Sequence, residues 1–317
     1  MSPDDTSLTR SMDDLAISSR NRSDSLFTTY QPASVKMYGR IFASTIYDGG
    51  HCYYLPVDDE ERYRQELCNS MWIEVGGHIL GSLKDIRPGI FLDLGAGWGI
   101  WVQEVSSLIP GRQVVGLDIH YDATGFYTFE NCSFEADNYE DPWVSRDQPV
   151  ALVHLRDSYF SLRQPRELAK NVFEGLCDGG WFQNEEMRLE NWTSESPKFN
   201  DWRLRTMEAA RRLGVPLHSA QDIETSFREA GFGEGWKEKF CLEASGETAM
   251  SQKLLEVVKL TVKASVRILV EGGSCGSTDV CDFVEDVVKE LEEGDHRITV
   301  EAEVYTARKP DFEGSPH

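Results

Sequence analysis

The feature of this sequence that most constrains its fold is a glycine-rich turn at residues 92–99, Leu-Asp-Leu-Gly-Ala-Gly-Trp-Gly. Gly95, Gly97 and Gly99 alternate strictly, and they stand between a short apolar run and an apolar segment of helical character. Glycine adopts positive φ angles without strain, and it lets the backbone approach a ligand closely because it has no Cβ. Such a turn predicts a β-α-β unit that binds its ligand at the carboxyl end of the strand.

The residues after the turn alternate between strand and helix patterns, which extends the unit into a sheet. We expect strands at 89–94, 113–119, 132–136, 150–155 and 181–187, helices at 100–109 and 165–177, and a turn at 178–180. Two later segments, 237–244 and 297–307, also have strand character, and the last can pair antiparallel with its neighbour. The sequence therefore predicts an α/β fold with a doubly wound, mostly parallel, seven-stranded sheet.

The chain divides into a tail, a cap and a main domain. Residues 1–26 are polar and rich in serine and aspartate, which predicts a flexible tail. Residues 27–88 form an N-terminal helical cap segment, and residues 89–310 form the main domain. Helical insertions at about 198–231 and 249–293 exceed what a minimal α/β fold needs. We expect these extra helices to form a lid over the carboxyl ends of the strands.

Charge and cysteine spacing restrict the partners. The formal net charge is −22, and so acidic a surface repels phosphate backbones, so we expect no nucleic-acid partner. The sequence has neither a secretory leader pattern nor an apolar run of about 18 residues, so we expect no membrane partner and a cytoplasmic protein. The seven cysteines lack paired zinc-ligand spacing, so we expect reduced thiols and no metal site.

Three acidic residues near the ends of consecutive strands indicate the cofactor. Asp93 stands two residues before the first glycine, where a carboxylate would repel a pyrophosphate but can organise the loop beside a cationic, amine-bearing ligand. Asp118 ends the second strand and can accept hydrogen bonds from both hydroxyls of a ribose. Asp137 ends the third strand, where it either contacts an adenine or caps the following turn. S-adenosylmethionine carries a sulfonium and an amine but no phosphate, so this pattern favours it over a dinucleotide.

Several stretches together resemble a known family. They are YYLP at 53–56 with Asp58, Glu61 and Arg64, DLGAGWGIW at 93–101, FEADNYEDPW at 134–143, VHLRD at 153–157, GGWFQNEE at 179–186 and YTARKP at 305–310. With these motifs the chain resembles class I S-adenosylmethionine methyltransferases, and more closely the fungal LaeA-like group of secondary metabolism. The resemblance covers roughly residues 53–310 and implies a Rossmann-like fold with S-adenosylmethionine as its cofactor.

The resemblance also implies which residues surround the cofactor: the glycines form its loop, and Asp118 binds the ribose. The full set expected at the cofactor site is Tyr53, Asp93, Gly95, Gly97, Trp98, Gly99, Asp118, Ile119, Asp137, Asn138, His154 and Arg156. Two residues depart from the family pattern, since Trp98 replaces a small threonine and Val57 replaces an asparagine. The bulky Trp98 either shapes the acceptor pocket or narrows the methionine end of the cofactor site.

Catalysis needs a base only when the acceptor must lose a proton. His154, at the carboxyl end of the fourth strand, is the candidate for this role, although a structural histidine fits the same position. Glu185 and Glu186 alternate in direction after the fifth strand, so at most one faces the pocket, and we expect Glu185 to act in catalysis by orienting the acceptor. Trp202 and Met207 either line an apolar acceptor pocket or pack in the helical core.

The sequence therefore predicts an S-adenosylmethionine-dependent methyltransferase that acts on an oxygen, nitrogen or sulfur atom of a small molecule in fungal secondary metabolite biosynthesis. Two other hypotheses stay open. One is a regulator of the LaeA type that works through protein partners, and the other is a methyltransferase-fold enzyme that catalyses a pericyclic reaction, with Trp98 in the altered loop. One scaffold hosts many functions, so neither the acceptor nor the oligomeric state follows from the fold.

Overall fold

The computed structural model describes residues 33–44, 52–76, 86–120, 129–143, 148–245, 247–294 and 297–311. The tail expected at 1–26 lies outside these residues. The described part forms an α/β domain around one large sheet. Its strands are β3 (Ile90–Leu94), β4 (Val114–Asp118), β5 (Cys132–Ala136), β6 (Val150–Arg156), β7 (Leu176–Glu186), β8 (Trp192–Ser194), β9 (Trp236–Ala244) and β10 (Ile298–Arg308).

The order of the strands is β5-β4-β3-β6-β7-β10, and both β8 and β9 pair with β10. Neighbours from β5 to β7 run parallel, whereas β10 runs antiparallel to its three partners. This confirms the doubly wound, mostly parallel sheet, in which the short strand β8 joins the seven strands that the sequence predicts. The strand order reverses between β3 and β6, and open α/β sheets bind ligands in the crevice at such a point.

β7 begins earlier than the sequence indicates. We expected a turn at 178–180 that launches the strand, whereas β7 starts at Leu176. The pairing with β6 is interrupted after Leu176 and resumes at Trp181, so the residues between them form a bulge inside the strand. Gly179 adopts a φ of +70° in this bulge, a conformation that L side chains rarely adopt. The glycine signal was therefore correct, but it marks a bulge.

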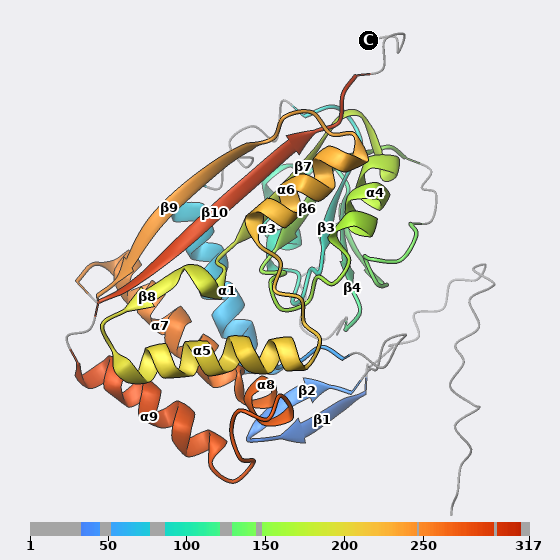
Figure 1. Cartoon of the computed structure of the whole chain (residues 1–317). Coiled ribbons are helices and arrows are strands. Elements are labelled where there is room, and N and C mark those ends of the chain that lie inside the picture. The colour runs from blue at the N-terminus through green and yellow to red at the C-terminus, as the bar shows by residue number, and fades with distance from the viewer. Residues whose placement is uncertain are drawn as a thin grey trace, which may run out of the picture.

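Helices cover both faces of the sheet. α4 (Pro165–Gly175) and α6 (Ala220–Ala230) pack together on one face, and α3 (Ile100–Leu108) covers the other (Figure 1). α6 begins with a capping box between Ser219 and Asp222, which satisfies two backbone N–H groups at the helix start. Its Phe227 is fully buried against the sheet.

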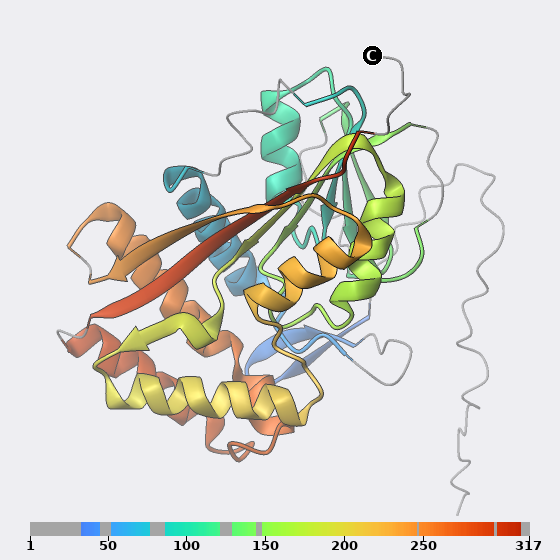
Figure 2. The same ribbon diagram turned by 45° about the horizontal axis from the view of Figure 1, so that its top comes forward.

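A second group of helices gathers at one end of the sheet (Figure 2). This helical layer consists of α1 (Asp59–Glu74), α5 (Pro197–Arg212), α7 (Ala249–Ala264), α8 (Val266–Glu271) and α9 (Val280–Glu293). Of the helices in the two expected insertions, α6 packs on the sheet and the others belong to this layer.

β10 belongs to both parts of the molecule. Ile298 and Val300, at its start, lie in the hydrophobic core of the helical layer. Tyr305 and Ala307, near its end, lie in the core between the sheet and the helices α4 and α6. Figure 1 shows this long strand, in red, running from the helical layer to the far end of the sheet. One continuous strand therefore joins the two cores.

A β-hairpin precedes α1. β1 (Ser34–Met37) and β2 (Arg40–Ala43) pair antiparallel. The sequence pattern predicts helix in 27–88 and gives no sign of this hairpin, because each strand has only four residues. Arg40 donates from Nε and Nη2 to the two carboxylate oxygens of Asp58, at 2.8 and 2.7 Å. Asp58 also accepts from the backbone N–H of Glu61 as the N-cap of α1, so it ties the hairpin to the helix.

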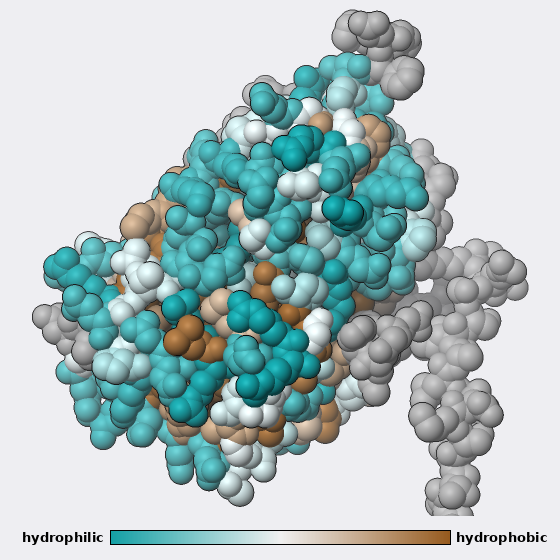
Figure 3. Space-filling view, viewed as in Figure 1, coloured by the Kyte–Doolittle hydropathy of each residue, from teal (hydrophilic) through white to brown (hydrophobic). Residues whose placement is uncertain are grey.

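The face of the molecule seen in Figure 3 is mostly hydrophilic, in keeping with the net charge of −22. Large apolar side chains that are exposed on the described chain lie on different elements, such as Leu204 on α5 and Trp236 on β9. No helix in the described ranges has both the length and the apolar character needed to span a bilayer.

The substitution Phe182→Ala should lower the free energy of unfolding by about 3–5 kcal/mol, because it leaves a cavity between the sheet and α6. Phe182 is fully buried, and its ring stacks on that of Phe227 with centroids 3.9 Å apart. Leu204→Ala, at a side chain that is 58% exposed, is the control and should change the free energy by less than about 0.5 kcal/mol. Urea unfolding followed by tryptophan fluorescence measures both. Equal losses would contradict this account of the core.

Candidate active site

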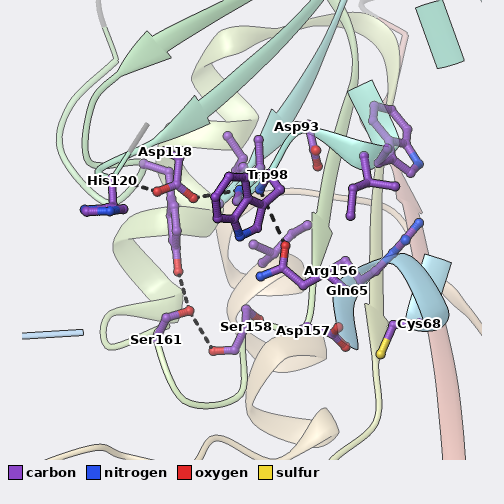
Figure 4. A pocket seen from close by; sticks show the side chains of 18 of the residues that line it. Gln65, Cys68, Asp93, Trp98, Asp118, His120, Arg156, Asp157, Ser158 and Ser161 are labelled. Atoms are coloured by element: carbon purple, nitrogen blue, oxygen red, sulfur yellow. Dashed lines mark hydrogen bonds between the residues drawn. The ribbon is translucent and has the colours of Figure 1, made fainter. Parts of the chain in front are cut away.

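A cleft opens at the carboxyl ends of β3, β4 and β6, beside α1 (Figure 4). It encloses about 1180 Å³, including space open to solvent. Most of the residues expected at the cofactor site line this cleft: Tyr53, Asp93, Gly95, Gly97, Trp98, Asp118, Ile119, His154 and Arg156. Gly99, Asp137 and Asn138 do not line it.

The glycine turn shapes one wall of the cleft. Gly95, Gly97 and Gly99 have φ angles of +67°, +53° and +67°, which explains why the sequence needs glycine at alternate positions. The backbone N–H of Gly97 donates to Oδ2 of Asp118 at 2.8 Å. Gly99 is buried and is the N-cap of α3. Its role is to turn the chain into the helix, whereas the first two glycines face the cleft.

Asp118 ends β4 beside this turn. Its Oδ1 accepts from the backbone N–H of His120 at 2.7 Å, and its Oδ2 accepts from Gly97. Burial raises the pKa of Asp118, although these two hydrogen bonds oppose the shift. Each carboxylate oxygen has a second lone pair, so the side chain keeps acceptor capacity toward the cleft. This is the arrangement that a ribose with two hydroxyls requires.

Trp98 is one of the two departures from the family pattern, and it lines the cleft, as does Val57. In the view of Figure 4, its indole lies between Asp118 and Arg156. Its backbone N–H lies 3.5 Å from Oε1 of Gln65, and the guanidinium of Arg62 lies over its ring at 5.6 Å. α1 therefore holds this residue from the side opposite the sheet, and the indole takes up space that a threonine would leave open.

Asp137 and Asn138 form a turn outside the lining of the cleft. Asp137 is exposed, and its Oδ1 accepts from the backbone N–H of Asn138 at 2.9 Å. Asn138 in turn accepts from the backbone N–H of Glu140 at 3.2 Å. These contacts favour the turn-capping alternative for this pair. Tyr139, which is not among the residues expected at the site, lines the cleft instead, and its hydroxyl lies 3.2 Å from Oγ of Ser161.

A row of buried charged side chains crosses three strands at the wall of the cleft. Asp93 on β3 and His154 on β6 are register partners, and Oδ1 of Asp93 lies 2.7 Å from Nδ1 of His154. Nε2 of His154 lies 3.3 Å from Oε2 of Glu185 on β7, which also accepts from Nε of Arg156 at 2.7 Å. The ring of Trp101 stacks on the imidazole with a centroid distance of 4.2 Å. We call these residues Asp93, His154, Glu185 and Arg156 the charged row.

Neighbouring charges favour the ionised forms of His154 and Glu185. Burial alone would lower the pKa of His154, but hydrogen bonds and charges from Asp93 and Glu185 outweigh it and raise that pKa. Burial alone would raise the pKa of Glu185, but Arg156 and His154 lower it to about 2. The imidazolium is therefore fixed between two carboxylates, because each of its nitrogens has an acidic partner.

The geometry does not favour either of the two catalytic expectations. His154 was expected as a base, but both of its ring nitrogens are engaged and neither has a lone pair free for an incoming proton. Glu185 was expected to orient the acceptor, but it lies behind the cleft between His154 and Arg156 and lines neither cavity. Their contacts are with Asp93 and Arg156, which line the cleft.

Hydrogen bonds connect the charged row to the helices α1 and α3. Nη1 of Arg156 donates to Oδ1 of Asn69 on α1 at 2.7 Å, and Nδ2 of Asn69 donates to Oε2 of Glu104 on α3 at 2.6 Å. A second buried pair lies one turn earlier on α1, where Arg64 donates to Glu61 at 2.7 to 3.1 Å. These contacts fix α1 across the mouth of the cleft.

A second cavity adjoins the cleft. It encloses about 610 Å³, including space open to solvent, and Arg64 and Asp157 line both spaces. Its walls come from α5, α7, α8 and the segment after β7: among them are Glu186, Trp192, Trp202, Thr206, Val257 and Ile268. Trp202 lines this cavity and also packs in the helical core, so it fits both sequence alternatives, whereas Met207 packs in the core and does not line the cavity.

The cleft suits a cationic nucleoside. Asp93, Asp118 and Asp157 line it. Among the described residues that line the cleft, both arginines are already paired, Arg64 with Glu61 and Arg156 with Glu185. Free cationic groups for a pyrophosphate are therefore lacking in this part of the chain, whereas carboxylates for hydroxyl and amine groups are present. This donor set fits S-adenosylmethionine.

Comparison with known proteins gives a family. A family model described as a methyltransferase domain matches residues 62–233, which is more than half of the chain. This chain belongs to that methyltransferase family. Its cofactor is S-adenosylmethionine, as the acids and the glycine turn indicate.

This methyltransferase is similar to several curated fungal proteins. The secondary metabolism regulator laeA of Aspergillus flavus is 28% identical over 188 residues, 57% of this chain and 50% of that protein. The protein-methionine methyltransferase laeA of Emericella nidulans is 28% identical over 189 residues, with the same shares covered. The methyltransferase pytC of Aspergillus terreus is 26% identical over 203 residues, 61% of this chain and 62% of that protein. The chain spans about half the length of the laeA relatives it matches.

Sequence reasoning missed several residues that line the cleft of this methyltransferase. They include Arg64, Gln65 and Asn69 on α1, and Asp157 and Ser158 after β6. One signal was available: Glu61 and Arg64 are opposite charges three residues apart on a helix face that also carries apolar residues, the pattern of a buried pair. The residues after β6 carry no such pattern, because a loop has no periodicity to read.

We expect Asp118→Ala to weaken S-adenosylmethionine binding by about 1–3 kcal/mol, because the ribose hydroxyls lose a charged acceptor. Asp137→Ala is the matched control, since this acid lies outside the cleft lining, and it should leave the affinity unchanged. Isothermal titration calorimetry measures both, with circular dichroism to verify folding. A larger loss for Asp137→Ala would restore the adenine role and contradict the placement described here.

The stabilisation by His154 should depend on pH with a defined sign. The pKa of His154 is raised above its usual 6.5, so its imidazolium stabilises the fold in full below about pH 6.5 and loses this effect as the pH rises through the folded-state pKa. Urea unfolding of the unsubstituted protein and of His154→Gln should therefore differ most at low pH. A difference that grows toward alkaline pH would contradict the charged row.

Proposed function

We propose that this chain is an S-adenosylmethionine-dependent methyltransferase whose acceptor is a small molecule of fungal secondary metabolism, methylated on oxygen, nitrogen or sulfur. The observation that carries the proposal is the junction of the cofactor cleft with a second cavity, at Arg64 and Asp157. A methyl donor in one space and an acceptor in the other meet at this junction in a fixed orientation. Orientation of this kind supplies a large part of the rate of a displacement reaction.

The proposal assigns a task to each wall of the cleft. Asp118 accepts from the ribose hydroxyls, and the glycine turn lets the nucleoside approach the backbone. Asp93 and Asp157 present carboxylates to the cationic end, and Tyr53 covers the cleft from the side of α1. When bound, S-adenosylmethionine supplies a methyl group on a positively charged sulfur, which makes that methyl carbon electrophilic.

The protein's own contribution is positioning and exclusion of water. Within the charged row, His154 contacts Asp93 and Glu185 contacts Arg156, so both cleft residues are held in place. Asn69 bonds to Arg156 and so fixes α1 over the same wall. The second cavity lies among fully buried side chains such as Trp202 and Val257. An acceptor that binds there would lose most of the water around its apolar surface. A dry, ordered site favours displacement without a strong base.

The names of the relatives raise a second class of acceptor. One relative is named a protein-methionine methyltransferase and another a regulator, so a protein acceptor is the alternative to a small molecule. We favour the small molecule, because the second cavity is lined mainly by buried apolar side chains, as small-molecule sites usually are. A pericyclic reaction would use the same cavity but yield no methylated product.

Two measurements test the proposed function. Calorimetric titration with S-adenosylmethionine, S-adenosylhomocysteine and NAD should give binding of the first two and none of the third. Incubation with S-adenosylmethionine carrying a deuterated methyl group and a fungal metabolite extract, followed by mass spectrometry, should label a small molecule. Tighter binding of NAD would contradict the cofactor assignment. Label found only in protein, or in no product, would contradict the acceptor assignment.

A further inference from the structure

Glu186 is the acid of the Glu185–Glu186 pair that faces the second cavity. It ends β7, its side chain is 2% exposed, and it lines the cavity. Its Oε2 accepts from both the backbone N–H and Oγ of Ser158, each at 2.9 Å. Its Oε1 has no hydrogen-bond partner within the described residues. One oxygen is thus fixed, and the other is left for a ligand.

Two further polar atoms of the cavity lack partners. Nε1 of Trp192 and Oγ1 of Thr206 are buried and form no hydrogen bond with any described residue. Both residues line the cavity and are less than 4% exposed, at 3% and 1%. A buried polar atom without a partner costs about 1–3 kcal/mol, and a ligand that pairs with it removes that cost. A carboxylate oxygen, a hydroxyl and an N–H group without partners among the described residues thus belong to three residues that line one largely apolar space.

The geometry points to the second cavity as the binding site of the methyl acceptor, an apolar ring molecule that carries an acidic hydroxyl, and to Glu186 as the group that accepts the proton of that hydroxyl. This inference rests on the proposed function. An acidic hydroxyl of the phenol or enol type enters the cavity neutral, whereas an amine enters charged and pays a far larger desolvation penalty. The oxygen of such a ligand also offers lone pairs to the unpaired N–H of Trp192.

The position of Glu186 connects the two spaces. Ser158, which holds its Oε2, lines the cofactor cleft, while Glu186 lines the acceptor cavity. Glu186 takes the proton as the acceptor oxygen forms its bond to the methyl carbon and the electron pair of the breaking carbon–sulfur bond returns to the sulfonium sulfur. The products are the methyl ether, neutral S-adenosylhomocysteine and a protonated Glu186, which releases its proton to water once the product has left.

The surroundings of Glu186 suit a proton acceptor at neutral pH. Burial raises its pKa to about 7, together with the charge of Asp157, while Arg188 and the hydrogen bonds from Ser158 oppose the rise. Tyr159 also faces it from the segment after β6. A group whose pKa lies near the working pH is in the form that accepts a proton and can also release it afterwards.

Calorimetry with simple probes tests the site in protein saturated with S-adenosylhomocysteine. The probes are 1-naphthol, which carries the hydroxyl, and 1-methoxynaphthalene, which resembles its methylated product. We expect the protein to prefer 1-naphthol by about tenfold, the effect of one hydrogen bond to a charged group. Glu186→Gln should abolish this preference without changing the affinity for S-adenosylhomocysteine. The preference should also fall between about pH 8 and about pH 6, because Glu186 becomes protonated, an effect that a purely structural role would not produce.

Two more variants keep the test decisive if Glu186→Gln does not fold. Ala264→Leu adds volume at a residue that lines the cavity and should weaken both probes together. Met207→Leu, on the same helix as Thr206 but outside the cavity lining, should leave both unchanged. An unaltered preference in Glu186→Gln, or undiminished binding in Ala264→Leu, would overturn the inference. If S-adenosylhomocysteine itself does not bind, the proposed function fails; if it binds and 1-naphthol does not, only this inference fails.

Discussion

The site depends on a histidine that is clamped between two carboxylates in the middle of the sheet. Asp93, His154 and Glu185 come from three neighbouring strands, and Arg156 completes the alternation of charge. Each charge is buried, so removing one partner leaves its neighbour uncompensated, which costs about 3–5 kcal/mol for a buried pair. The positions of the strand ends, of α1 through Asn69 and of α3 through Glu104 all follow from this row. The row sets the geometry of the cleft wall, and the proposed proton acceptor, Glu186, lies outside it on the second cavity.

The parts of this structure that follow from sequence are those governed by local rules. The glycine turn, the acid at the end of β4 and the strand and helix order all have short-range signatures: positive φ at alternate glycines, an acid after an apolar run, and regular periodicity. The hairpin at residues 34–43 and the short strand β8 carry too few residues for a periodicity to emerge. Asp137 shows a further limit, because an acid after a strand has the same sequence signature whether it caps a turn or binds a ligand.

The acceptor side was harder to predict because it depends on which way one residue faces. Glu185 and Glu186 are neighbours in β7, and side chains alternate in direction along a strand. Glu185 therefore points toward His154 and Arg156, whereas Glu186 lines the second cavity. The sequence indicates that at most one of them faces the pocket, but the bulge at Gly179 shifts the register on which the choice depends. Trp202 and Met207 are both apolar residues of α5, so their sequence does not tell them apart. Only the packing of the helix shows that Trp202 lines the cavity and that Met207 does not.

The length of β10 has a consequence for how an acceptor reaches its cavity. Because the strand begins in the core of the helical layer and ends in the core of the sheet, the two parts share one continuous backbone ladder. A hinge between them would have to break that ladder, so wholesale domain opening is a costly route of entry. The proposed acceptor would then enter through local motions of the segments around the junction, near Arg64 and Asp157. The two cores would move together as one rigid body.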